Sequence, residues 1–134
     1  MNGQFSLNLR SAARQERIEG LVSFVAEDAS GSFGILPGHE RFLTLLDYGL
    51  ARFRTSSGPW RYVACPGAVL YFTGHELFLD TRRYLVDDDY GRISALLAGQ
   101  LAQEEAALKS VKDNLQRLEQ ELFRHLRRLE GRRV

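Results

Sequence analysis

The stretch GSFGILPGHERFLTLL, residues 31–46, decides how the N-terminal part of the chain is interpreted. It combines three glycines with Pro37, and an apolar run from Phe42 to Leu46 follows the last glycine. A phosphate-binding loop would need a helix directly after its glycines, together with a Lys-Ser or Lys-Thr pair. The sequence has no such pair there, and Ile35 and Leu36 lie between the glycines. The stretch therefore predicts a strand, a Pro-Gly turn and a second strand.

Short runs of apolar or alternating residues also occur on both sides of this stretch. Residues 5–9 alternate between apolar and polar side chains, which is typical of a half-buried strand. Residues 50–54 and 60–64 alternate on either side of Ser-Ser-Gly-Pro and predict a hairpin. Further apolar runs occupy residues 21–26, 68–72, 77–79 and 84–86. A turn signal about every eight to twelve residues favours a sandwich or barrel, and we expect residues 1–86 to fold alone as a β domain.

Residues 87–134 have a different character and predict a helical domain. Between Gln100 and Glu130 there is neither glycine nor proline. Apolar side chains follow a seven-residue repeat, broken by the polar Glu104 and His125: Leu97, Leu101, Leu108, Val111, Leu115, Leu118, Leu122 and Leu129. One coiled-coil-like helix of about 42 residues would be about 63 Å long, or the chain could fold back at residues 109–114 into a hairpin. This leucine seam must pack on itself, on the β domain or on a partner helix.

Composition excludes several classes of function. The 134 residues include 18 basic and 17 acidic side chains, so bulk charge gives no reason to expect a nucleic-acid partner. The single cysteine, Cys65, cannot form an internal disulfide. No run approaches the roughly 18 apolar residues of a membrane span. No apolar core of a signal peptide is visible. We expect a soluble cytoplasmic protein. His39, His75 and His125 lack zinc spacing, and no catalytic arrangement is visible, so we expect neither a metal site nor an enzyme.

Two segments carry a resemblance to a known family. The first is the 31–46 stretch, which matches the pattern G-x-x-G-I-x-x-G-H-x-P-x-L-T at Gly31, Gly34, Ile35, Gly38, His39, Leu43 and Thr44, with Arg41 in place of the proline. The second is PGAVLYFTGHELFLDT, residues 66–81. With a β domain followed by a helical part, the chain resembles the epsilon subunit of F-type ATP synthases, including its divergent or alternative branches. The resemblance implies an N-terminal β-sandwich of about ten short strands followed by a helical hairpin or one long helix.

The resemblance also implies a function and a set of partner-binding residues. The chain is expected to be a non-catalytic rotor subunit, peripheral on the cytoplasmic side of the inner membrane, that couples the gamma subunit to the c ring. Contacts with gamma and the c ring are expected in the 31–42 loop region, at Ser32, Phe33, Gly38, His39 and Phe42. Phe33 and Phe42 are expected to be exposed, and Ser32 stands where many members carry an acidic residue. Inhibition of ATP hydrolysis is expected from basic residues that meet the catalytic β subunit: Arg124, Arg127 and Arg128, with Arg132 and Arg133 nearby.

Asp89 and Arg92 resemble part of an ATP-binding motif that some bacterial members carry at the start of the first helix. The flanking apolar residue and the alanine of that motif are missing here. An aspartate at a helix start is also common for capping alone, and Asp87, Asp88 and Asp89 are all placed for it. We therefore expect no cofactor and little ATP binding. Two alternatives stay open: an ATP-sensing regulatory subunit, and a stand-alone sandwich adaptor that dimerises through its leucine seam.

Overall fold

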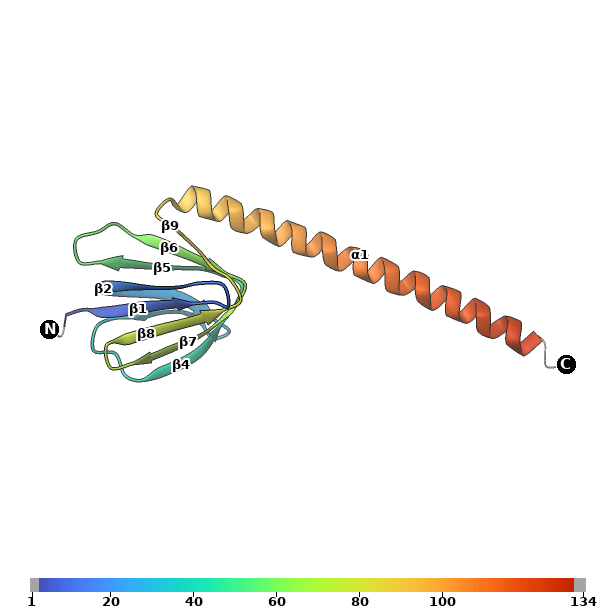
Figure 1. Ribbon diagram of the computed structural model, residues 1–134, viewed down its shortest axis with the longest axis horizontal. Helices are drawn as coiled ribbons and strands as arrows, with labels where there is room; N and C mark the ends of the chain where they lie inside the picture. The colour runs from blue at the N-terminus through green and yellow to red at the C-terminus, as the bar shows by residue number, and fades with distance from the viewer. Residues whose placement is uncertain (1–2, 132–134) are drawn as a thin grey trace. The chain divides into compact units, whose positions relative to one another are not determined.

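The computed structural model describes residues 3–131. In that range a β-sandwich is followed by one long helix, as the sequence predicted, and the sandwich has nine strands where about ten were expected. The elements are β1 (Phe5–Arg10), β2 (Gln15–Asp28), β3 (Gly31–Ile35), β4 (Phe42–Leu46), β5 (Gly49–Thr55), β6 (Arg61–Cys65), β7 (Ala68–Thr73), β8 (Glu76–Thr81), β9 (Leu85–Asp87) and α1 (Tyr90–Gly131) (Figure 1).

Strand β2 belongs to both layers of the sandwich. Its first half pairs antiparallel with β1, from Gln15 opposite Arg10, and its second half pairs with β3 and β5. Gly20 lies between the halves with φ 79°, a left-handed conformation that glycine adopts without strain. The sequence predicted only residues 21–26 of this strand. The missed half, Gln15–Gly20, is polar because it lies at the rim of the β1 layer and most of its side chains face solvent.

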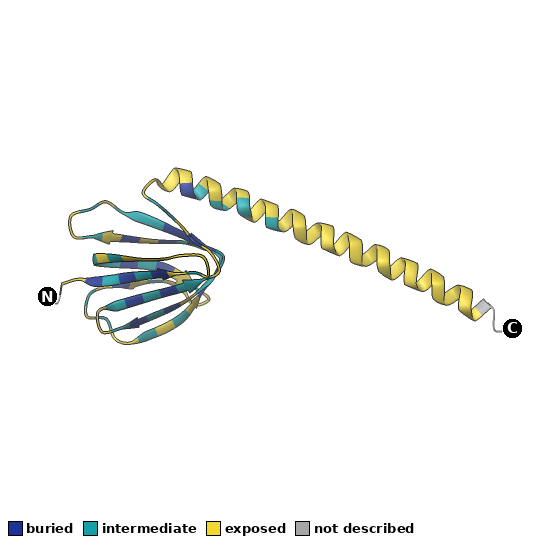
Figure 2. Cartoon of the chain, viewed as in Figure 1, coloured by how far each residue is buried: buried dark blue, intermediate teal, exposed yellow. Residues whose placement is uncertain are grey.

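The core lies between the two layers. One layer contains β1, β8, β7 and β4, and β5, β6 and β9 form the other (Figure 1). Strand β1 pairs in parallel with β8, with Leu7 opposite Leu77. Buried positions occur on strands of both layers (Figure 2), and Phe24, Phe53 and Phe72 are fully buried. Each phenylalanine buried in this way contributes about 1.5–3 kcal/mol relative to an exposed one.

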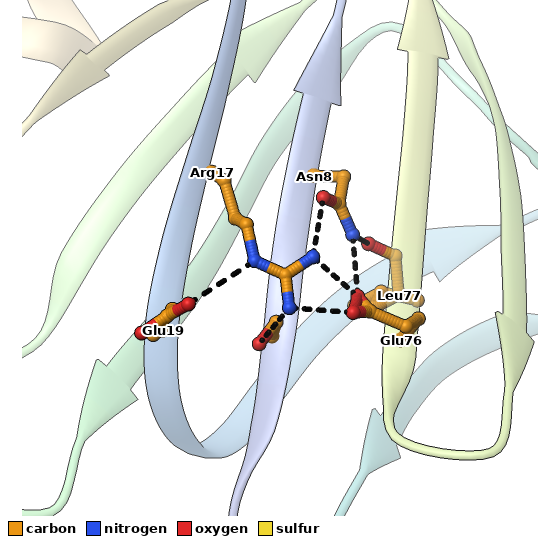
Figure 3. A network of polar contacts seen from close by, with 6 residues as sticks. Asn8, Arg17, Glu19, Glu76 and Leu77 are labelled. Carbon is orange, nitrogen blue, oxygen red and sulfur yellow. Dashed lines mark hydrogen bonds and ion pairs between the residues drawn. The ribbon is translucent and has the colours of Figure 1, made fainter.

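A polar network holds β1 between its two neighbours at the surface (Figure 3). The Arg17 guanidinium donates to Asn8 Oδ1 at 3.2 Å and to Glu76 Oε2 at 2.9 Å, and its Nε donates to Glu19 at 3.3 Å. Asn8 Nδ2 in turn donates to Glu76 Oε2 at 2.9 Å and to the Leu77 carbonyl at 3.2 Å. The hydrogen bond from Arg17 lowers the pKa of Glu76. The network therefore stabilises the fold above the ordinary glutamate pKa and weakens as the pH falls through the lowered value.

The first two turns of α1 belong to the same compact unit as the sandwich. Ile93 is fully buried, and the Tyr90 ring lies edge-on to Tyr62 of β6 with a centroid distance of 5.3 Å. The chain divides by its internal contacts into the units Met1–Leu97 and Ala98–Val134. This division falls inside the helix, later than the expected boundary at residue 86. Independent folding of residues 1–86 stays a prediction.

Helix α1 runs without interruption from Tyr90 to Gly131, so the single long helix is correct and the hairpin is not formed. The polar segment 109–114 is helical throughout. Beyond Leu97 the apolar seam is exposed along its described length, with Leu118 62% exposed and Leu122 60% exposed (Figure 2). Within residues 3–131, no helix combines the length and the apolar character needed to span a membrane.

Candidate partner-binding site

The residues expected in one loop, 31–42, are divided between two places. Residues 31–35 form strand β3 and are not a loop, because they pair with Phe24–Asp28 of β2. Ser32 lies at the β2–β3 end, where its hydroxyl donates to Glu27 Oε1 at 3.2 Å. His39 lies in the turn that follows the other end of β3. Ser32 lies three steps along β3 from Ile35, which is about 10 Å at about 3.3 Å per residue, and the turn with His39 lies beyond that end.

The turn between β3 and β4 is built around an aromatic cluster. Phe33 and Phe42 have a ring centroid distance of 5.2 Å, and the His39 ring lies 5.5 Å from Phe42 and 5.9 Å from Phe72. Gly38 has φ 81°, and the His39 amide donates to the Leu36 carbonyl at 3.1 Å. The expectation that Phe33 and Phe42 are exposed is wrong, since both are partly buried and pack against the core. Their first role is to stabilise the turn.

The outer surface of the β4–β7–β8 layer carries an apolar face that the sequence analysis missed. Leu43 and Leu45 of β4 are 67% and 68% exposed, and Val69 of β7 is 42% exposed. Leu43 pairs with Tyr71 and Leu45 with Val69, and Tyr71 is stacked on Phe78 of β8. These five residues are called the apolar face below. The signal was present, because residues 42–46 are apolar except for Thr44, and apolar side chains at odd and even positions of one strand indicate that both of its faces are covered.

The apolar face is bounded by charge and continues into a shallow groove. Arg10 Nε donates to Asp80 Oδ1 at 2.6 Å, and the Arg10 guanidinium lies 4.6 Å from the centre of the Phe78 ring. A groove of about 610 Å³ runs beside Leu45 and Val69 towards Asp80. An apolar centre with a polar rim is the usual anatomy of a protein–protein interface.

The start of α1 shows the geometry of a capped helix. The Arg92 amide donates to Asp89 Oδ1 at 3.0 Å, and the Ile93 amide donates to the Asp89 carbonyl at 3.1 Å. Asp89 is therefore the N-cap, which confirms the predicted capping. The Arg92 guanidinium donates two hydrogen bonds to Asp87, at 2.6 and 2.7 Å, and so holds the pKa of that carboxyl well below its usual range. Asp89 and Arg92 are thus each engaged within the chain.

Replacing Asp89 by alanine is expected to lower the free energy of unfolding by about 1 kcal/mol, because the Arg92 amide loses its acceptor. Thermal or urea unfolding followed by circular dichroism measures the change. Asp88→Ala is the matched control, since the Asp88 side chain is 71% exposed and does not cap the helix; it should change stability by less than about 0.5 kcal/mol. Equal losses in both variants would contradict the assigned cap.

The predicted basic cluster lies on one side of α1. Arg124, Arg127 and Arg128 are exposed, and within residues 3–131 no ion pair joins them to another side chain. At about 100° per residue they fall within an arc of about 100°, so all three can face one partner. Arg132 and Arg133 lie outside the described residues. Among residues 3–131 no group of three or more His, Cys, Asp or Glu side chains is arranged to hold a metal ion.

Comparisons with known proteins agree with the resemblance seen in the sequence. Residues 4–79 match the family model described as "ATP synthase, Delta/Epsilon chain, beta-sandwich domain". ATP synthase epsilon chain 2 of Cereibacter sphaeroides is 40% identical over 118 residues, which cover 84% of this chain and 81% of the relative. ATP synthase epsilon chain 2 of Paraburkholderia xenovorans is 37% identical over 78 residues, which cover 58% of this chain and 56% of the relative.

Two solved structures share the fold. A chain of the Euglena gracilis mitochondrial ATP synthase superposes with a TM-score of 0.59 at 16% identity, covering 75% of this chain and 65% of that one. A chain of the Tetrahymena thermophila mitochondrial ATP synthase gives a TM-score of 0.51 at 13% identity, covering 60% of this chain and 65% of that one. The family model and the Cereibacter relative, together with the sandwich and its helix, show that the chain belongs to the delta/epsilon chain family of ATP synthases.

Proposed function

We propose that the chain is a non-catalytic central-stalk subunit that rotates with the gamma subunit and couples it to the c ring of an ion-translocating ATP synthase. Family membership supports this role. The Euglena match comes from an assembly described as OSCP, F1 and c-ring, and the Tetrahymena match from one described as central stalk and c-ring. In this role the chain sits peripherally on the cytoplasmic side of the membrane.

The apolar face is the observation that carries the proposal. Leu43 and Leu45 are each about two thirds exposed on the outer face of β4, and large apolar side chains that lie together in contact with water mark an interaction surface. A rotor subunit must stay attached while torque passes through it, and a continuous apolar surface with a charged rim provides such attachment. We assign this face to gamma, and the turn that carries His39 to the c ring. Ser32 lies at the other end of β3, so it is not part of the contact with the c ring that we assign to the His39 turn.

The helix supplies the regulatory part of the proposal. Its exposed leucine seam has the seven-residue spacing that packs against a partner helix. Arg124, Arg127 and Arg128 present positive charge that complements an acidic segment of the catalytic β subunit. Docked in this way, α1 would restrain rotation in the direction of ATP hydrolysis.

The two alternatives have less support from the geometry. An ATP-sensing role needs the Arg92 guanidinium, whose hydrogen bonds to Asp87 a nucleotide would have to replace. A free adaptor that dimerises through its seam would use α1 but would leave the apolar face uncovered. The rotor role accounts for both surfaces.

Co-purification with the other subunits tests the proposal. When the chain is co-expressed with gamma, the catalytic hexamer and the c ring, it is expected to elute with them in a fixed ratio. The measurement is size-exclusion chromatography with subunit quantification, and a tagged chain expressed alone serves as the reference. Elution as a homodimer in the presence of gamma would reject the rotor role and favour the adaptor.

A further inference from the structure

Two arginines of the other layer are stacked on the same indole ring. Arg52 and Arg54 project from the outer face of β5, and both side chains are exposed. Their guanidinium carbons lie 4.6 and 5.4 Å from the centre of the Trp60 ring, which is itself partly buried. Cation–π stacking uses the faces of the guanidinium groups, so their N–H edges stay available to an acceptor.

These two arginines differ from four others in the unit that contains the sandwich. Arg10, Arg14, Arg17 and Arg92 each form an ion pair with a carboxylate of the chain. Within residues 3–131, no ion pair joins Arg52 or Arg54 to a carboxylate. The two side chains are therefore held in place by an aromatic ring while their charge is left uncompensated.

A groove begins at Arg52 and runs under the first turns of α1. It has a volume of about 420 Å³, and its walls include Tyr62 of β6 and Tyr90 of α1. Glu27 also lines it, two residues beyond Val25, which pairs with Arg52, and on the side away from Arg54. The groove thus offers aromatic walls beside a fixed positive pair. Arginine and tryptophan or tyrosine side chains are the residue types that most often dominate binding energy at interfaces.

We propose that Arg52, Arg54 and Trp60 form a binding site for an acidic segment of a partner protein. Carboxylates of the segment accept hydrogen bonds from the two guanidinium edges, and a neighbouring apolar or aromatic side chain enters the groove between Tyr62 and Tyr90. Prior stacking on Trp60 reduces the side-chain entropy that the arginines lose on binding. The site lies on the layer opposite the apolar face, so it does not depend on the proposed contact with gamma.

Other anionic partners fit this surface less well. Insertion into a membrane interface needs exposed apolar or aromatic side chains, whereas the turn before Trp60 carries only Thr55, Ser56, Ser57, Gly58 and Pro59. The Trp60 ring is also covered by the two guanidinium groups. A nucleic acid needs a longer basic stripe than two arginines to neutralise successive phosphates.

Trp60 makes the site directly measurable, because it is the single tryptophan of the chain. Its fluorescence is followed while the full chain is titrated with a synthetic glutamate-rich peptide that carries one phenylalanine. A matched peptide with glutamine in place of glutamate is the control. The acidic peptide is expected to change the emission saturably, with an affinity that falls as salt is added, while the neutral peptide binds at least tenfold more weakly.

Variants locate the effect at the site. The double variant Arg52→Gln/Arg54→Gln keeps the fluorophore and is expected to weaken acidic-peptide binding about tenfold. Arg82→Gln, at an exposed arginine between β8 and β9, should bind as the unaltered chain does. Equal binding of both peptides, or unchanged affinity in the double variant, would overturn the proposal. So would an emission shift with phosphatidylglycerol vesicles that neither the acidic peptide nor phosphatidylcholine vesicles produce, which would identify a membrane surface instead.

Discussion

Replacing both Leu43 and Leu45 by glutamate is expected to weaken binding to the gamma subunit by about 100-fold or more. The two side chains are 67% and 68% exposed and are the most exposed of the apolar face, so the change places two charges where the proposed contact excludes water. Loss of apolar anchors that an interface buries typically costs about 2–4 kcal/mol, which corresponds to roughly 30- to 1,000-fold in affinity. Calorimetric titration of isolated gamma with the variant measures the effect.

The control for this experiment keeps the apolar character of the same two positions. Leu43→Val with Leu45→Ile retains β propensity and most of the apolar area, and it should bind gamma within a few-fold of the unaltered chain. Both pairs of variants should melt close to the unaltered chain, because the side chains point away from the core. Normal gamma binding by a folded glutamate variant would exclude the apolar face from the interface.

Deleting residues 110–134 is expected to raise ATP hydrolysis by the assembled complex several-fold while leaving ATP synthesis coupled. The deletion lies within the unit Ala98–Val134, so the sandwich and its apolar face remain complete. It removes most of the leucine seam, and each leucine that the seam buries in a partner contributes about 1.5–3 kcal/mol. Hydrolysis rates and proton or sodium pumping, measured on reconstituted complexes with and without the deletion, check both parts of the result.

The arginines should account for a smaller share of the same inhibition. Exposed ion pairs are worth about 0–1 kcal/mol each, so replacing Arg124, Arg127 and Arg128 together by alanine should raise hydrolysis by only a few-fold. Added salt should reduce the difference between the triple variant and the unaltered chain. If the deletion abolishes assembly, α1 is structural and the regulatory assignment is wrong.

The sequence predicted the elements whose signals are local. Alternation at residues 50–54 and 60–64 predicted the hairpin that β5 and β6 form. The leucine repeat without glycine or proline predicted the helix, which begins directly after Asp89 in the structure. Fold-back of that helix was not decidable from the pattern, since the polar residues of segment 109–114 suit either a turn or a solvated helix face. The single helix depends on the continuity of backbone hydrogen bonding through this segment.

The candidate site was less predictable, because its residues are defined by pairing across the sheet. A pattern match placed Ser32 and His39 in one loop, while pairing between β2 and β3 separates them along an extended strand. The residues of the apolar face are brought together by the pairing registers of β4 with β7 and of β7 with β8, and no local sequence pattern predicts those registers. The stacking of Arg52 and Arg54 on Trp60 depends in the same way on hairpin register.

The parallel pairing of β1 with β8 has a consequence for how the chain is made. Leu7 pairs with Leu77, and β1 pairs with β2 on its other edge. The first strand of the chain therefore has both edges paired only when β8, one of the last strands, is in place. During synthesis β1 can form a hairpin with β2 early, but its second edge has no partner until β8 leaves the ribosome. Contacts of such large sequence separation close slowly. The β4–β7 pair carries four of the five residues of the apolar face and can form before β8 joins β7 to β1, so exposed apolar surface is present on the nascent chain before the sandwich closes.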